Sequence, residues 1–266
     1  MSLPPCLAQS RRWDKNGSGR HGAAITGSAQ SGAINTISCL DVAANSNGVK
    51  TGFPEAASIS SLETSLKIYY AAASPFVRKC LVAAAELGLR DKIELVSAAA
   101  HPVNRDKSVV AYNPLGKIPT MITDENTVLY DSRVICEYLN SLGDGHLLPR
   151  EGKARWGVLV EQSLADGVCD AAVLTRYETF ARPEPLRWKE WITGQLEKVN
   201  SGLDLIEARA AGFGDRIDLG TIAFGCALGY LDFRFASLGW RDTRPHATAW
   251  FERFGARPSM VATRPT

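Results

Sequence analysis

Long apolar runs and a strong net charge are both missing from this sequence. A helix that crosses a membrane needs about 18 or more apolar residues in a row, and no such run occurs. We therefore expect no membrane span. The formal net charge is +2, which argues against a large phosphate-binding face and so against a nucleic-acid partner.

Disulfide and metal motifs are missing as well. The six cysteines are scattered and form no C-x-x-C pair, and the four histidines lie far apart without the spacing of metal ligands. Several cysteines fall on apolar helical faces. This pattern favours reduced, buried thiols in a cytoplasm over a disulfide framework, and it predicts no metal site.

Residues 1–65 have no sustained hydrophobic period and are rich in Ser, Gly, Ala and Asn. Their apolar stretches are too short and too polar for a secretory signal, although the basic, Ser-rich start could mimic a transit peptide. We interpret residues 1–65 as a disordered extension or as the product of a start site assigned too far upstream.

The remaining 201 residues divide into an α/β part and a helical part. Residues 66–142 read as alternating strands and helices, with a strand at 92–96, a loop with a short helix at 97–112 and a helix at 131–142. Residues 143–150 read as a linker. Residues 151–266 read as helical, with helices predicted at 152–181, 184–210, 220–237 and 245–255.

The run Asn113–Pro119 combines a turn with a strand that begins at a proline. Pro114 and Gly116 favour the turn. Proline cannot donate to a β-ladder, so Pro119 marks either an edge position or a cis bond. A cis Ile118–Pro119 bond would direct the N–H and C=O of Ile118 outward, where an extended peptide could pair as an added strand.

A second motif follows the next predicted strand, where the chain enters a helix at Asp131-Ser132. The free N–H groups and positive dipole end of a helix N-terminus attract a carboxylate. A backbone pairing edge beside a carboxylate site predicts a receptor for a small anionic peptide.

The predicted fold begins with a strand at 66–70 and a helix that starts at Ser74-Pro75. Serine is a favoured N-cap, and proline is favoured at the first helical position. Val77, Leu81 and Ala84 then recur at helical spacing. On these residues alone, the simplest role of Ser74 is to accept a backbone N–H at the helix start.

Together these motifs resemble the glutathione transferase family, in particular its serine-type, YibF-like bacterial branch. The resemblance covers about residues 66–260, including Leu164–Gly167 and Gly229–Arg234, and does not cover residues 1–65. It implies a thioredoxin-like α/β N-terminal domain (66–142) and an all-α C-terminal domain (151–266). Ser74 and Val77 stand where a redox protein with this fold carries Cys-x-x-Cys.

The resemblance implies that Ser74 is catalytic. Its hydroxyl would donate to the sulfur of bound glutathione and, with the helix dipole, lower the thiol pKa. The resulting thiolate would attack a small electrophile. Tyr69 and Tyr70 lie upstream of the turn and are expected to be structural, and Cys80 is expected to be a core thiol.

The resemblance also implies a set of glutathione-binding residues. Ile118, held by cis-Pro119, would pair with the cysteinyl segment, and Lys117 would approach the glycyl carboxylate. Asp131 and Ser132 would hold the γ-glutamyl amine and carboxylate. Simpler alternatives are a solvated surface lysine for Lys117 and a plain helix cap for Asp131-Ser132.

Three further residues are assigned less firmly by the resemblance. Phe76 would shape the sulfur pocket, with Arg78 near it, although both could be packing or surface residues. Asp170 would reach across a dimer to the γ-glutamyl amine, although an exposed helical aspartate is the commoner explanation.

The electrophile is expected between residues 71–76 and the first long helix of the second half. Candidate pocket residues on that helix are Val173, Arg176, Tyr177 and Phe180. Tyr177 and Phe180 share a helical face, but an aromatic stripe is more often core than pocket. Arg176 could favour an anionic substrate or form a surface ion pair.

The resemblance therefore implies a cytoplasmic, homodimeric glutathione transferase active in detoxification, with glutathione as co-substrate and no metal. Two alternatives stay open. One is a non-catalytic glutathione-binding or regulatory protein of the same fold. The other is a glutathione-dependent disulfide reductase, which the absence of cysteine at position 74 disfavours.

One departure from the family pattern concerns the helix near residue 220. Relatives usually begin it with a Ser/Thr-x-x-Asp capping box. Here Thr221 is followed three residues later by Phe224, which predicts that the box is missing and the cap weakened.

Overall fold

The computed structural model describes residues 66–265, so the prediction for residues 1–65 lies outside it. Four strands form one sheet in the order β2-β1-β3-β4. They are β1 (Leu66–Tyr70), β2 (Ile93–Ser97), β3 (Thr120–Ile122) and β4 (Val128–Leu129). β1 pairs parallel with β2 and antiparallel with β3, and β3 pairs antiparallel with β4. This is the sheet of the predicted thioredoxin-like part.

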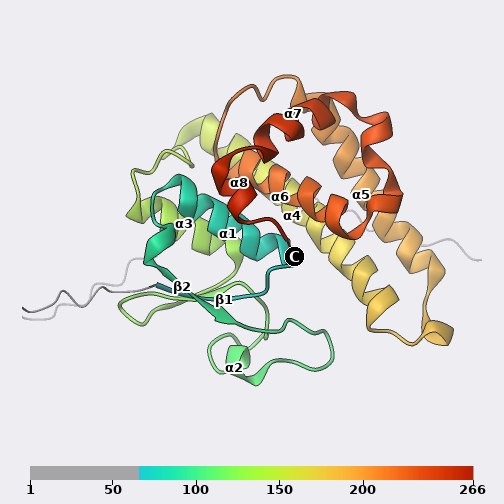
Figure 1. Ribbon diagram of the computed structural model, residues 1–266, viewed down its shortest axis with the longest axis horizontal. Coiled ribbons are helices and arrows are strands. Elements are labelled where there is room, and N and C mark those ends of the chain that lie inside the picture. The colour runs from blue at the N-terminus through green and yellow to red at the C-terminus, as the bar shows by residue number, and fades with distance from the viewer. Residues whose placement is uncertain (1–65, 266) are drawn as a thin grey trace, which may run out of the picture. The chain divides into compact units, whose positions relative to one another are not determined.

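Three helices accompany the sheet. α1 (Pro75–Glu86) and α3 (Ser132–Leu142) pack together over one face, and the short α2 (Lys107–Val110) lies on the other side (Figure 1). The apolar side chains of the sheet and of the two longer helices enclose a core, in which Ile68 and Met121 form a cross-strand pair without solvent exposure.

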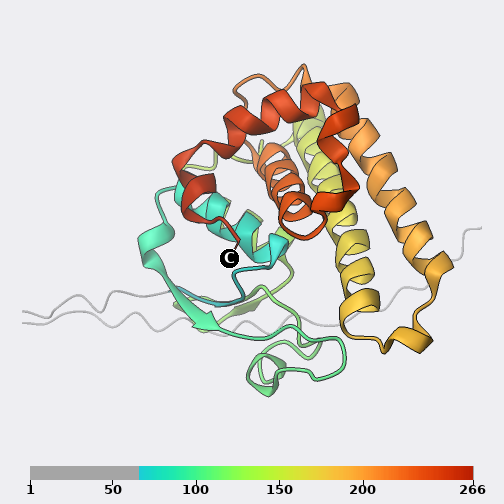
Figure 2. The same cartoon turned by 45° about the vertical axis from the view of Figure 1, so that its right-hand side comes forward.

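The helical part consists of five α-helices. α4 (Gly152–Phe180) and α5 (Lys189–Ala210) are long neighbours, and α6 (Leu219–Arg234) packs against both α4 and α1 (Figure 2). α7 (Pro245–Gly255) contacts α5 and α6, and α8 (Pro258–Ala262) returns to α1. The C-terminal end of the described chain therefore lies near the start of α1 (Figure 1).

α6 is the central helix of this part. Every residue from Leu219 to Leu231 is buried, and a helix that is apolar on all sides is typical of a buried position. α6 brings Tyr230, near its C-terminal end, toward the start of α1.

The prediction that α6 lacks a capping box is wrong. The box begins three residues earlier, at Asp218, whose Oδ1 accepts from the Thr221 N–H at 2.9 Å. The Thr221 Oγ1 accepts in return from the Asp218 N–H at 3.0 Å. Thr221 is thus the third residue of the helix and not its cap, so the sequence interpretation placed the cap three residues too late.

Other boundaries also differ from the prediction. A 3₁₀ turn occupies Glu184–Leu186, and α5 begins only at Lys189, because Pro183 and Pro185 flank and interrupt the segment that was predicted as helix. α6 ends at Arg234, and α8 was not predicted.

Within residues 66–265, no helix is long and apolar enough to cross a membrane. The same residues contain no group of three or more His, Cys, Asp or Glu side chains placed to hold a metal ion. The four cysteines among them (Cys80, Cys136, Cys169 and Cys226) are buried and not disulfide-bonded.

Candidate functional site

Ser74 is the N-cap of α1. Its backbone is extended, and its Oγ accepts from the Val77 N–H at 3.3 Å, with Pro75 at the first helical position. The side chain is half-buried. Because the hydroxyl accepts this bond, its own proton remains available to a group beyond the helix end.

The Ile118–Pro119 peptide bond is cis, which is one of the two possibilities that the sequence allowed. β3 begins just after it, and Thr120 pairs with Tyr69 of β1, so Ile118 lies close to the chain that leads from β1 into Ser74. Among the hydrogen bonds of the described residues, none involves the N–H or C=O of Ile118. The Lys117 carbonyl, in contrast, accepts from Asn113 Nδ2 at 3.1 Å and from Thr120 Oγ1 at 2.8 Å.

The N-terminus of α3 has the cap that the sequence predicted. Asp131 is exposed, and its Oδ1 accepts from the Arg133 N–H at 2.9 Å. Ser132 is only 3% exposed, and its carbonyl accepts a weak bond from Cys80 Sγ at 3.7 Å. Ser132, at the start of α3, therefore lies against α1 at the position of Cys80. No hydrogen bond of the described residues uses the Ser132 N–H.

A buried ion cluster joins α1, α3 and α4, and no local sequence pattern indicates it. Lys79 Nζ donates to both carboxylate oxygens of Asp166, at 2.6 and 2.8 Å, and Arg133 Nε donates to Asp166 Oδ2 at 2.9 Å. The Lys79 and Asp166 side chains are 1% and 4% exposed. Burial opposes the charge on Lys79, but the Asp166 carboxylate outweighs it and raises the pKa of Lys79. Asp166 thereby fixes the start of α3 relative to α1.

Asp170, one turn after Asp166 on α4, faces the same region. Partial desolvation, followed by the negative charge of Asp166, raises the pKa of Asp170, and the positive charges of Lys117 and Arg133 oppose the rise. The side chain nevertheless keeps an exposed face. Lys117 is exposed.

Phe76 and Arg78 differ in where they lie. Phe76 is half-buried and packs against the core. Arg78 is buried, not on the surface, and its Nη2 donates to the Met260 carbonyl at 2.9 Å. Arg78 also lines a narrow cavity beside Ser74, together with Tyr230 of α6 and Pro265. The cavity has no room for a water molecule.

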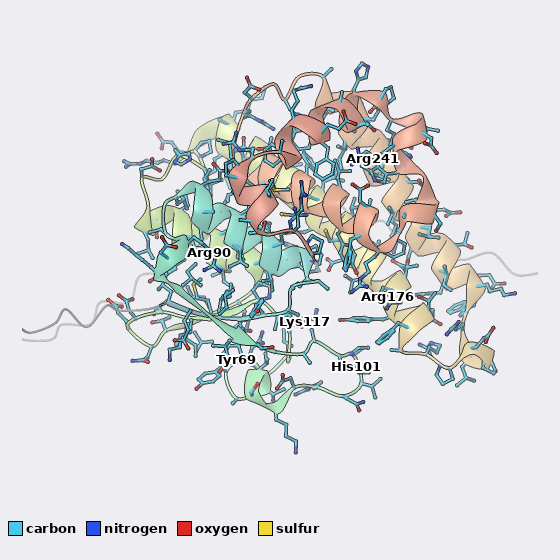
Figure 3. The ribbon with its side chains drawn as sticks, viewed as in Figure 1. Tyr69, Arg90, His101, Lys117, Arg176 and Arg241 are labelled. Carbon is cyan, nitrogen blue, oxygen red and sulfur yellow. The ribbon has the colours of Figure 1, made fainter. Side chains whose placement is uncertain are left out.

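The C-terminal end of α4 carries the residues that the sequence predicted for a second-substrate pocket. Tyr177 donates from its hydroxyl to the Ala100 carbonyl at 3.1 Å, and the Phe180 ring lies 6.5 Å from the ring of His101. The Arg176 guanidinium lies 4.5 Å from the centre of the same Phe180 ring. Figure 3 shows Arg176 on α4, with His101 and Lys117 on the loops below it. The half-buried Val173, one turn earlier, packs against the core.

Sequence reasoning missed Tyr230 as a residue of this region, although it quoted Gly229–Arg234 as a family motif. Tyr230 is buried on α6 and lines the cavity beside Ser74. Burial raises the pKa of Tyr230 to about 12. Its hydroxyl therefore stays protonated at neutral pH.

Comparisons with known proteins identify the family. Residues 73–142 match the glutathione S-transferase N-terminal domain, and residues 189–253 match the glutathione S-transferase C-terminal domain. The uncharacterized GST-like protein YibF of Escherichia coli (strain K12) is 34% identical over 204 residues, which cover 75% of this chain and 98% of that protein.

Solved structures of similar proteins indicate the same family. A glutathione transferase family member from Pseudomonas fluorescens Pf-5, with bound glutathione, is 43% identical and has a TM-score of 0.74. The match covers 76% of this chain and 100% of that one. The same relative with bound S-(propanoic acid)-glutathione matches at 42% identity and a TM-score of 0.71, with the same coverage. The chain belongs to the glutathione S-transferase family.

Proposed function

We propose that this protein is a glutathione transferase in which Ser74 stabilises the thiolate of bound glutathione, and the thiolate attacks a small electrophile. The observation that carries the proposal is the Ser74 hydroxyl at the N-terminus of α1, with its proton free to donate. A sulfur placed there would also meet the positive end of the α1 dipole. Both effects favour a thiolate over a thiol.

Glutathione would lie extended between Ser74 and the start of α3. The unpaired N–H and C=O of Ile118 supply one edge for its cysteinyl segment. The free N–H of Ser132 suits the γ-glutamyl carboxylate, since helix N-termini bind anions. The carboxylates of Asp131 and Asp170 suit the γ-glutamyl ammonium, and Lys117 the glycyl carboxylate.

The transfer step needs little else from the protein. The Ser74 hydroxyl would hold the sulfur as a thiolate, and the helical part would hold the electrophile beside it. Binding both reactants in one complex replaces a bimolecular encounter, which supplies much of the rate. The S-substituted glutathione bound by the Pseudomonas fluorescens relative supports room for such a group beside the sulfur.

A cytoplasmic homodimer that acts in detoxification completes the proposal. A groove of about 950 Å³ runs between α4 and α5, and its wall includes Val160, Leu164 and Val168. Trp156 and Val160 of α4 are 65% and 58% exposed. Exposed apolar surface of this kind is typical of protein interfaces, and Asp170 on the same helix would then lie near the second copy.

The domain boundaries at residues 142 and 151 also remain a prediction.

The test is calorimetric binding of glutathione to the full-length chain, together with conjugation of glutathione to a generic aryl-halide acceptor. Binding with turnover is the expected result. Binding without turnover would favour the non-catalytic alternative or a specialised electrophile. Absence of binding would contradict the proposal.

A further inference from the structure

Arg78 is a buried cation one helical turn after Ser74, and the mechanism above gives it no role. The residue is only 7% exposed, and a guanidinium stays charged in proteins. Its Nη2 donates to the Met260 carbonyl at 2.9 Å, and its Nε donates to Thr263 Oγ1 at 3.4 Å. α6 passes so close that a Cβ added at Gly229 would collide with Nη1. These contacts fix the guanidinium in place, but both acceptors are neutral and leave its charge unbalanced.

No counter-ion balances this charge. Within residues 66–265, no carboxylate lies within ion-pair distance of Arg78. The next residue, Lys79, is also buried, but it pairs with Asp166 at 2.6 Å. The first turn of α1 has no acidic residue, and the positive end of a helix dipole disfavours a nearby cation. The charge of Arg78 is therefore costly to bury, and an anion at the start of α1 would offset this cost.

The narrow cavity beside Ser74 connects this charge to the reacting centre. Ala73, Ser74 and Pro75 line the cavity at the start of α1, and Arg78 lines it as well. Because the cavity has no room for a water molecule, solvent cannot enter it to screen the guanidinium. A sulfur at the Ser74 hydroxyl would stay outside the cavity. It would interact with the charge of Arg78 through a medium of low dielectric constant, in which charges act strongly.

We propose that the Arg78 guanidinium supplies the counter-charge of the glutathione thiolate, acting across the cavity while the Ser74 hydroxyl donates to the sulfur. This inference rests on the proposed function and deepens it, because the Ser74 site defines where the sulfur lies. The two residues contribute differently, since Ser74 acts through a hydrogen bond and Arg78 through its charge alone. Any side chain that keeps a cation at position 78 should therefore keep most of the effect.

The test measures the pKa of the glutathione thiol bound to the full-length chain, from the ultraviolet absorbance of the thiolate across pH. Arg78→Met removes the charge and keeps a long apolar stem. We expect it to raise this pKa by about 1, the lower end of the effect of one nearby opposite charge. The affinity for S-propylglutathione, which has no thiol to ionise, should change little. Arg78→Lys, which keeps a cation but not the geometry of the two hydrogen bonds, should retain most of the low pKa.

The matched control is Arg257→Met. Arg257 also ties the region of α8 to α1, because it donates to Glu86 at 3.0 and 3.1 Å. Glu86 is the last residue of α1, at the end opposite Ser74. The control thus removes the same charge and a similar tie far from the sulfur, and it should leave the thiol pKa unchanged.

Two results would overturn the inference. One is an unchanged thiol pKa in Arg78→Met, and the other is an equal rise in Arg78→Met and Arg78→Lys, which would mean that the hydrogen bonds to α8 matter and the charge does not. If Arg78→Met does not fold, Arg78→Gln takes its place, because its amide can still donate to the Met260 carbonyl. A pKa that responds to Ser74→Ala but not to loss of the Arg78 charge would contradict this inference alone. Failure to bind glutathione, or an unchanged pKa in Ser74→Ala, would contradict the proposed function itself.

Discussion

At the scale of single residues, the buried cluster around Asp166 matters most for the glutathione site. Asp166 accepts hydrogen bonds from Lys79 and Arg133 at once, so it sets the distance between the helix that carries Ser74 and the helix that begins at Ser132. Lys79 is completely enclosed. A buried ammonium without its counter-ion is costly.

We predict that Asp166→Asn lowers the free energy of unfolding by about 3–5 kcal/mol, because it leaves Lys79 buried without a negative partner. Urea denaturation measures the loss. The control is Glu94→Gln, which breaks the ion pair between Glu94 and Lys67 at 3.3 Å. Both side chains of this pair are about half exposed, at 49% for Lys67 and 50% for Glu94, so the pair should contribute less than about 1 kcal/mol. Equal losses in the two variants would contradict the role given to Asp166.

At the scale of elements, the capping box at Asp218 defines where α6 begins. We predict that Asp218→Ala destabilises the protein by about 1–2 kcal/mol, since Thr221 loses the acceptor of its N–H in a buried position. Asp218→Asn, which keeps an acceptor at the cap, should cost less. Thermal unfolding of the two variants gives the comparison. If Asp218→Ala left the stability unchanged, the capping box would not be formed.

The crossing of α4 and α5 depends on a glycine. A Cβ at Gly202 would lie 2.3 Å from Val168 Cγ2, and a β-branched side chain in a helix has little rotamer freedom with which to move away. Gly202→Ala should therefore lower the stability by about 1–3 kcal/mol. Gly157→Ala in α4 is the control, because no atom lies within 4 Å of the added Cβ. That variant should be neutral or gain up to about 1 kcal/mol.

The order of strands and helices could be predicted because periodicity, proline and cap residues act locally. Ser74-Pro75 and Asp131-Ser132 both lie where the sequence placed helix starts. The Asp218 box was misplaced because two plausible caps lie three residues apart, and only the folded chain selects one. The pairing of Lys79 with Asp166 joins residues 87 positions apart, and no local pattern encodes it. The place of Tyr230 beside Ser74 depends in the same way on how α6 packs against α1.

At the scale of the whole molecule, the enclosed thiols link titration to folding. Burial raises the pKa of Cys169 well above its ordinary value, and that of Cys226 to about 12. A thiol whose pKa is higher in the folded chain than in the unfolded chain contributes its full stabilisation at pH values below the unfolded pKa. The stability should then fall as the pH rises past about 8.5, the pKa of an exposed thiol, toward the folded values.

We therefore predict that Cys80, Cys136, Cys169 and Cys226 resist a thiol reagent at neutral pH in the folded chain and react once urea unfolds it. Peptide mass spectrometry after labelling assigns each site. Ready labelling of any of the four in the native protein would show that the core around α1, α4 and α6 opens more easily than its packing implies.

The central claim is that Ser74 stabilises the glutathione thiolate, and the pKa of the bound glutathione thiol tests it most directly. The ultraviolet absorbance of the thiolate, followed across pH, gives this pKa for the wild type, Ser74→Ala and Ser74→Thr. The pKa should lie below that of free glutathione in the wild type and in Ser74→Thr. In Ser74→Ala it should rise, with conjugation about 100-fold slower and the affinity for S-propylglutathione little changed. An unchanged pKa in Ser74→Ala would contradict the claim.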